Sequence, residues 1–126
     1  QVSVAVEGEL DKAGVLLDFI SFKPLVKRVC DDLDHRTLIQ RESPLLKIRE
    51  ERRGIEIRYQ DQRIILPRRD VILLPLANTS TELLAEYIAE RIRRLTQKQF
   101  PGARLHLIEV GVEEARGQRG FYRGEL

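Results

Sequence analysis

VAVEGELDKAGVLLDFISFKPLVKRVCDDLDHRTL, residues 4–38, changes its hydrophobic period part-way along. Val4 and Val6, with Val2 just before them, alternate with polar or small residues, and this period of two predicts a half-buried strand over residues 1–10. The turn residues DKAG follow, and the apolar run VLLDF, residues 15–19, is short enough to be a second strand.

The second part of the same stretch has the period of a helix. Apolar side chains recur three or four residues apart and predict one buried helix face, formed by Phe19, Phe22, Val26, Val29 and Leu33. Ser21 is the expected N-cap, and Pro24 fits the first turn, because the N–H that proline lacks would have no partner there. The helix should end near Leu33, which leaves Asp34 and His35 at its C-terminus.

A middle section, residues 44–75, alternates in polarity and carries many charges. GIEIRY and RIIL, joined by a short polar turn, predict a β-hairpin, and DVILLP predicts a further strand. The section contains Lys47 and seven arginines interleaved with acids. Such a surface is typical of a solvated strand edge that its charges protect from aggregation, and a nucleic-acid patch is the less favoured interpretation.

The clearest helix signal is NTSTELLAEYIAERIRRL, residues 78–95. Thr79 and Glu82 have the spacing of a capping box. The predicted buried stripe consists of Leu84, Ile88, Ile92 and Leu95, with Glu86, Glu90 and Arg94 lined up on the outside. LHLIEV and RGFYRG predict strands after this helix, so the element order indicates an α+β fold with helices packed on an antiparallel sheet.

Composition narrows the class of protein. A chain of 126 residues, 42% hydrophobic and 33% charged, is one globular domain by length. It has no apolar run of the roughly 20 residues that cross a membrane. Its single cysteine, Cys30, excludes an internal disulfide and suits a cytoplasmic location. The net charge of +2 gives little reason to expect a nucleic-acid partner.

Three motifs, in order along the chain, resemble the 6-pyruvoyl-tetrahydropterin synthase and 6-carboxy-tetrahydropterin synthase family. They are VEGELD…G…DF…LDH, TSTE, and LHLIEV followed by YRGE. The resemblance implies the tunnelling fold, in which an antiparallel sheet carries two helices on one face. It also implies a homo-oligomer, a trimer or hexamer, with active sites at subunit boundaries. The implied substrate is 7,8-dihydroneopterin triphosphate, which loses triphosphate while its side chain is rearranged or cleaved.

The resemblance assigns roles to particular residues. Asp34 and His35 match the family's acid/base partners, whereas spacing alone favours the polar end of a helix. Glu109 matches the glutamate that anchors the pterin ring, whose N–H and amino groups a carboxylate can accept in two parallel hydrogen bonds. The same family match places a second group of residues in the pterin pocket: Ser80, Thr81 and Glu82.

The resemblance also implies a zinc ion held by three histidines, and a catalytic cysteine. The surroundings of His35 and His106 do not match these motifs, and Cys30 is expected to be a packed thiol inside a helix. The first strand appears in mid-course at Gln1, so we expect an N-terminal strand region, with the zinc ligands and the cysteine, upstream of Gln1. A non-catalytic pterin-binding or oligomer-forming paralogue without the metal site is the alternative, and the choice between pyruvoyl and carboxy products stays open.

Overall fold

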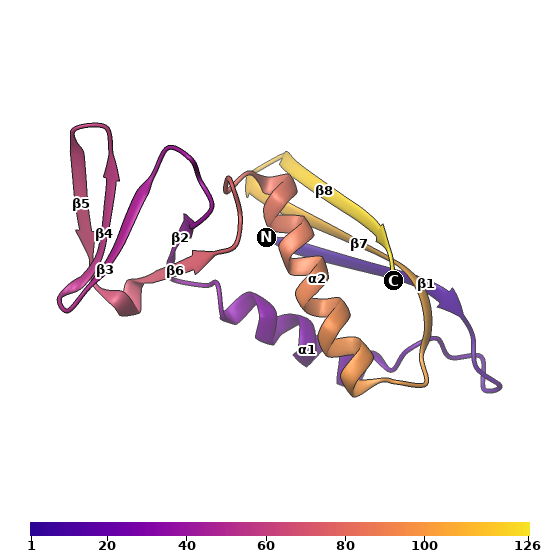
Figure 1. Cartoon of the computed structure of the whole chain (residues 1–126). Coiled ribbons are helices and arrows are strands. Elements are labelled where there is room, and N and C mark those ends of the chain that lie inside the picture. Colours follow the sequence, from indigo (N-terminus) through magenta and orange to yellow (C-terminus); the bar gives the residue numbers. More distant parts are fainter. The chain divides into compact units, whose positions relative to one another are not determined.

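The computed structural model describes all residues, 1–126, and the chain forms two compact units. The first unit consists of Gln1–Asp32 and Ser80–Leu126, and the second unit of Leu33–Thr79. Figure 1 shows the first unit as a twisted sheet with two helices, and the second as a set of short strands.

The sheet of the first unit has three antiparallel strands in the order β1-β7-β8. They are β1 (Val2–Glu9), β7 (Arg104–Ala115) and β8 (Gln118–Glu125). In register, Val4 lies opposite Val110, which lies opposite Tyr122, so these side chains share one face. Val110 is completely buried, which identifies this face as the core side.

Two helices supply the rest of that core: α1 (Phe19–Asp31) and α2 (Thr81–Gln99). Helix α2 packs along β7 and β8, and α1 packs against α2 (Figure 1). The buried helix residues include Phe22, Leu25, Val29, Ala85, Ile88, Ala89, Ile92 and Thr96. The predicted stripes are thus partly right. Phe19 is exposed and Leu25 replaces it, while the small residues of α2 lie deeper than Leu84 and Leu95.

The start of α1 corrects two predictions. Residues 15–19 form no strand, and the N-cap is Asp18 rather than Ser21. The Asp18 carboxylate accepts hydrogen bonds from the Ile20 N–H at 3.0 Å and from the Ser21 hydroxyl at 2.9 Å. Asp is as good an N-cap as Ser, so the helix begins three residues earlier than predicted. The apolar run before Asp18 leads into the helix instead of forming a strand.

The second unit contains two small sheets. One is the parallel pair β2 (Thr37–Gln40) and β6 (Val71–Leu74). The other is the antiparallel meander β3 (Lys47–Glu51), β4 (Gly54–Tyr59) and β5 (Gln62–Leu66), which the 3₁₀ turn η1 (Arg68–Asp70) follows. Buried Ile39, Ile55, Ile57 and Val71 join the two sheets in one core. The β4–β5 hairpin and the strand at Val71–Leu74 confirm the predictions, whereas β2 and β3 were not predicted.

Neither helix is both long and apolar enough to cross a membrane.

Candidate functional site

Asp34 and His35 lie in the turn between α1 and β2. His35 has a left-handed backbone with φ of 57°, which few residues other than glycine adopt. This turn folds the two neighbours together: Oδ2 of Asp34 lies 3.4 Å from Nε2 of His35, and Oδ1 of Asp34 accepts the His35 backbone N–H at 3.1 Å. Both side chains are exposed, at 63% and 93%.

The pair has the arrangement that general acid/base chemistry needs. An imidazole can take up and release a proton, and a carboxylate beside it fixes which nitrogen faces outward. Adjacent residues in a helix or strand point apart, so this contact depends on the left-handed turn. The exposed imidazole is open to a substrate that approaches from solvent.

The first turn of α2 carries Ser80, Thr81 and Glu82. Ser80 is the N-cap, and its hydroxyl oxygen accepts the Leu83 N–H at 3.3 Å. The capping box predicted between Thr79 and Glu82 is therefore wrong by one residue. Glu82 instead accepts the Thr81 hydroxyl at 3.2 Å and is exposed.

Thr81 also fixes this turn to the sheet. A Cβ added to Gly120 of β8 would collide with the Thr81 side chain and with the Glu82 backbone nitrogen. Only glycine permits that approach, so the helix N-terminus rests directly on strand β8.

Glu109 lies in the middle of β7, between Ala5 of β1 and Arg123 of β8. Its neighbours Ile108 and Val110 are buried on the helix side, so Glu109 leaves the sheet on the opposite face. Strict alternation along β7 would place Leu105 and Leu107 on this face as well. The register skips a residue between these two, so only Leu107 keeps the alternation, and Leu105 lines a cavity with Thr96 of α2.

The structure therefore brings the predicted residues together in groups. Asp34 contacts His35 within the second unit, and Ser80, Thr81 and Glu82 form one helix turn in the first. Glu109 is half-buried on the far face of the sheet from that turn. A site that uses both the turn and Glu109 of one copy would have to reach across the sheet.

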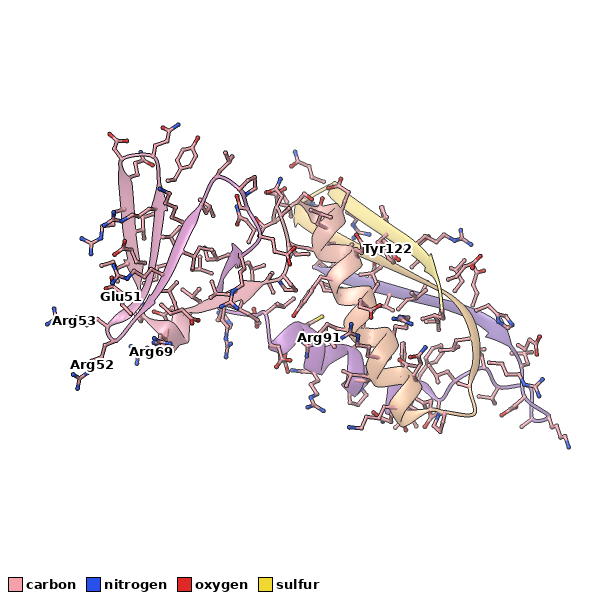
Figure 2. All side chains as sticks on the ribbon, viewed as in Figure 1. Glu51, Arg52, Arg53, Arg69, Arg91 and Tyr122 are labelled. Atoms are coloured by element: carbon pink, nitrogen blue, oxygen red, sulfur yellow. The ribbon has the colours of Figure 1, made fainter.

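Sequence reasoning missed Arg91, which projects from α2 (Figure 2). Its guanidinium donates to the Asp32 carboxylate at 2.8 Å and to the Tyr87 hydroxyl at 3.3 Å. These hydrogen bonds, with Tyr87 first, hold the pKa of Arg91 above its ordinary value. Asp32 is the C-cap of α1, so Arg91 secures the helix end two residues before Asp34. Asp32 and Arg91 are 59 positions apart, and no local pattern signals such a pair.

The residues of this chain do not fit a zinc site. No three His, Cys, Asp or Glu side chains are grouped to hold a metal ion. His106, on β7, is exposed, and its Nε2 lies 3.5 Å from Glu9 Oε1. Cys30 lies half-buried within α1.

Comparison with known proteins identifies the family of this chain. The model of the family described as 6-pyruvoyl tetrahydropterin synthase matches residues 1–125. The chain belongs to this family. The match runs through both units, and it establishes membership of a family of pterin-synthase lyases.

Individual relatives agree with the family assignment. The chain is 33% identical to a putative 6-carboxy-5,6,7,8-tetrahydropterin synthase of Methanocaldococcus jannaschii, over 99% of this chain and 77% of the relative. It is 32% identical to the protein of that name from Pyrococcus horikoshii, over 90% of this chain and 64% of the relative.

Solved structures of 6-pyruvoyl tetrahydropterin synthases have the same fold. The protein of Plasmodium falciparum superposes with a TM-score of 0.90 at 30% identity, and that of Plasmodium vivax with 0.92 at 27%. Each comparison covers 99% of this chain and 78% of the Plasmodium chain, a span that takes in residues 44–75. The expected α+β fold of this family, with two helices and antiparallel sheets, is confirmed.

Proposed function

We propose that this chain is a pterin synthase that converts 7,8-dihydroneopterin triphosphate, eliminating triphosphate and rearranging or cleaving the side chain, in the biosynthesis of a pterin or a deazapurine precursor. The contact between Asp34 and His35, 3.4 Å apart within the family match, carries this proposal. A left-handed backbone is uncommon outside glycine, and here it puts the exposed His35 imidazole beside a carboxylate. Both features fit a role of His35 in proton transfer.

In this proposal each group of residues has one task. His35 exchanges protons with the substrate side chain, and Asp34 orients the imidazole. Glu109 accepts the N–H and amino groups of the pterin ring in two parallel hydrogen bonds. Ser80, Thr81 and Glu82 contact the ring at the first turn of α2. A cytoplasmic location belongs to the same proposal, because it suits the single cysteine.

A homo-oligomer, a trimer or hexamer, is part of the proposal. Glu109 and the first turn of α2 lie on opposite faces of the β1-β7-β8 sheet. If both contact one pterin ring, two copies of the chain must supply them. The proposed site therefore lies at a subunit boundary.

Zinc dependence is proposed from the family resemblance alone. Each of the two histidines of the chain lies beside a single carboxylate: His35 beside Asp34, and His106 beside Glu9. Zinc bound to the substrate oxygens would act as a Lewis acid, and we assign no step of this chain to it.

The decisive experiment compares the two histidines in the full-length protein. Turnover of 7,8-dihydroneopterin triphosphate is followed by chromatography, which also separates pyruvoyl from carboxy products. We expect His35→Gln to lower kcat by about 100-fold or more, the usual loss when a general acid/base is removed. His106→Gln is the matched control and should keep nearly full activity. Equal activity of both variants would show that His35 is not the acid/base group.

The alternative is a non-catalytic pterin-binding or oligomer-forming protein. It predicts that the wild-type protein, with added zinc, binds a pterin in calorimetry without turnover. Glu109→Gln should then weaken binding, while Glu114→Gln, an exposed glutamate farther along β7, should not. An inactive wild-type protein with this binding pattern would replace the enzyme proposal.

A further inference from the structure

The outer face of the β3-β4-β5 meander carries a row of three cations. Lys47, Arg58 and Arg63 lie directly opposite one another on the three strands. All three are exposed, on the face opposite the core residues Ile55 and Ile57. Like charges directly opposite each other destabilise a sheet, so strand pairing does not explain the row.

A buried carboxylate supports two of these cations. Glu56 precedes Arg58 by two residues on the same face, and its side chain is only 4% exposed. Arg58 donates its Nε–H to Oε1, and Arg63 donates its Nε–H to Oε2 at 3.0 Å. Burial opposes ionisation of Glu56, but these hydrogen bonds outweigh it, and the pKa of Glu56 is below its ordinary value. The carboxylate therefore stays charged and holds both guanidinium groups in fixed positions.

Arg58 and Arg63 keep N–H donors that Glu56 does not use. Arg58 and Arg63 are 53% and 52% exposed, and each directs its Nε side at Glu56. A guanidinium has five N–H donors, so terminal amino groups remain for a ligand. Lys47 forms no ion pair with a carboxylate, and the row with Glu56 has a surplus of two positive charges.

We propose that this row, Lys47, Arg58 and Arg63, is a binding site for an oligophosphate, a chain of two or more linked phosphates. Planar guanidinium groups match phosphate oxygens in pairs of hydrogen bonds, and an ammonium adds a mobile third charge. Neighbouring strands are about 4.8 Å apart, so the row is about 10 Å long, which exceeds the reach of one phosphate and suits a linked chain.

The unit as a whole favours an anionic ligand. Residues 33–79 carry ten Lys or Arg and seven Asp or Glu, whereas the rest of the chain is slightly acidic. The site goes beyond the proposed pterin chemistry and does not depend on it, so either can fail without the other.

The test is titration calorimetry of the full-length protein with inorganic tripolyphosphate at low ionic strength. Lys47→Gln and Arg63→Gln should each weaken binding about five- to tenfold, the loss of one charge-assisted contact. The matched control is Arg53→Gln, which removes the same charge from the β3–β4 turn, outside the row (Figure 2). It should change the dissociation constant less than twofold. Lys47→Gln leaves the Glu56 contacts intact, so this variant tests the site even if Arg63→Gln unfolds.

Two further ligands identify the source of the phosphates. A nucleoside triphosphate that binds as tripolyphosphate does would show that the row reads phosphates alone, and tighter binding would indicate a nucleotide; both outcomes support the site. Equal losses in Lys47→Gln and Arg53→Gln would overturn it, because binding would then follow total charge. A single-stranded oligonucleotide that binds while tripolyphosphate does not would also overturn it, in favour of a nucleic-acid surface.

Discussion

Nε2 of His35 lies 3.4 Å from Oδ2 of Asp34, the residue directly before it, because His35 has a left-handed backbone. The proposed acid/base pair thus forms within a single turn. The contact needs no residue from elsewhere in the chain, and its cost is confined to one strained φ angle.

This strain predicts how position 35 responds to substitution. His35→Asn should keep the stability of the protein, because asparagine tolerates the left-handed region, while it abolishes activity. His35→Val should lower the free energy of unfolding by about 1–2 kcal/mol, since a β-branched residue resists positive φ. Urea unfolding measures both. Arg36→Val, at an exposed neighbour without positive φ, is the control and should be nearly neutral.

The Asp32–Arg91 pair predicts a coupling between α1 and α2. A double-mutant cycle with Asp32→Asn and Arg91→Gln should give a coupling energy of about 1 kcal/mol, because Arg91 is partly shielded and its hydrogen bond is 2.8 Å long. Lys98→Gln, at the exposed end of α2, should show no coupling to Asp32. Faster amide hydrogen exchange at residues 32–36 in the Arg91→Gln variant would show that the Asp32–Arg91 contact also restrains the turn that contains His35.

The contact between Gly120 and Thr81 predicts a steric effect. Gly120→Ala should lower the free energy of unfolding by about 1–3 kcal/mol, since the added methyl would force Thr81 and the first turn of α2 away from β8. Gly102→Ala is the matched control, because an added Cβ there meets no atom within 4 Å. If Gly120→Ala is as stable as Gly102→Ala in thermal unfolding, the helix does not rest on β8 as described.

Glu90 predicts a dependence of stability on pH. Hydrogen bonds from Arg93 and Arg94 lower the pKa of its carboxyl from 4.5 to about 2. The folded state therefore gains stability from the ionised carboxylate above pH 4.5, and loses it as the pH falls toward 2. Because the pair is half-exposed, the gain should be about 1 kcal/mol or less.

Urea unfolding of Glu90→Gln and of wild type, at a series of pH values, measures this gain. The difference between the two proteins should be constant above pH 4.5 and should vanish near pH 2. Glu86→Gln, one turn earlier on the same helix, is the matched control.

Local patterns predicted the elements that have strong periods. The alternation at Val2, Val4 and Val6, the helical spacing around Val29 and Ile92, and the β4–β5 hairpin all appear where the sequence indicates them. Capping was less predictable, because several residues in a row can cap a helix and packing selects among them. Asp18 and Ser80 were selected over Ser21 and Thr79 for this reason.

The sequence indicates candidate site residues but not how they are arranged. Spacing alone did not show that His35 has a positive φ, and an extra residue near His106 interrupts the strict alternation along β7 before Glu109. The β2–β6 pair and the Asp32–Arg91 contact join distant segments. Contacts of this kind have no local signature, because they depend on the tertiary fold.

The parallel pairing of β2 with β6 makes the meander a closed excursion of the chain. Thr37 lies beside Val71 and Gln40 beside Leu74, so residues 41–70 leave and return at neighbouring points. A change in the length of this excursion therefore need not alter the pairing of its two anchoring strands. Parallel strands require a crossover of about a dozen residues or more, and that requirement sets the smallest replacement the protein could accept. Because Ile39 and Val71 share one core with Ile55 and Ile57, any replacement would also have to cover these two side chains.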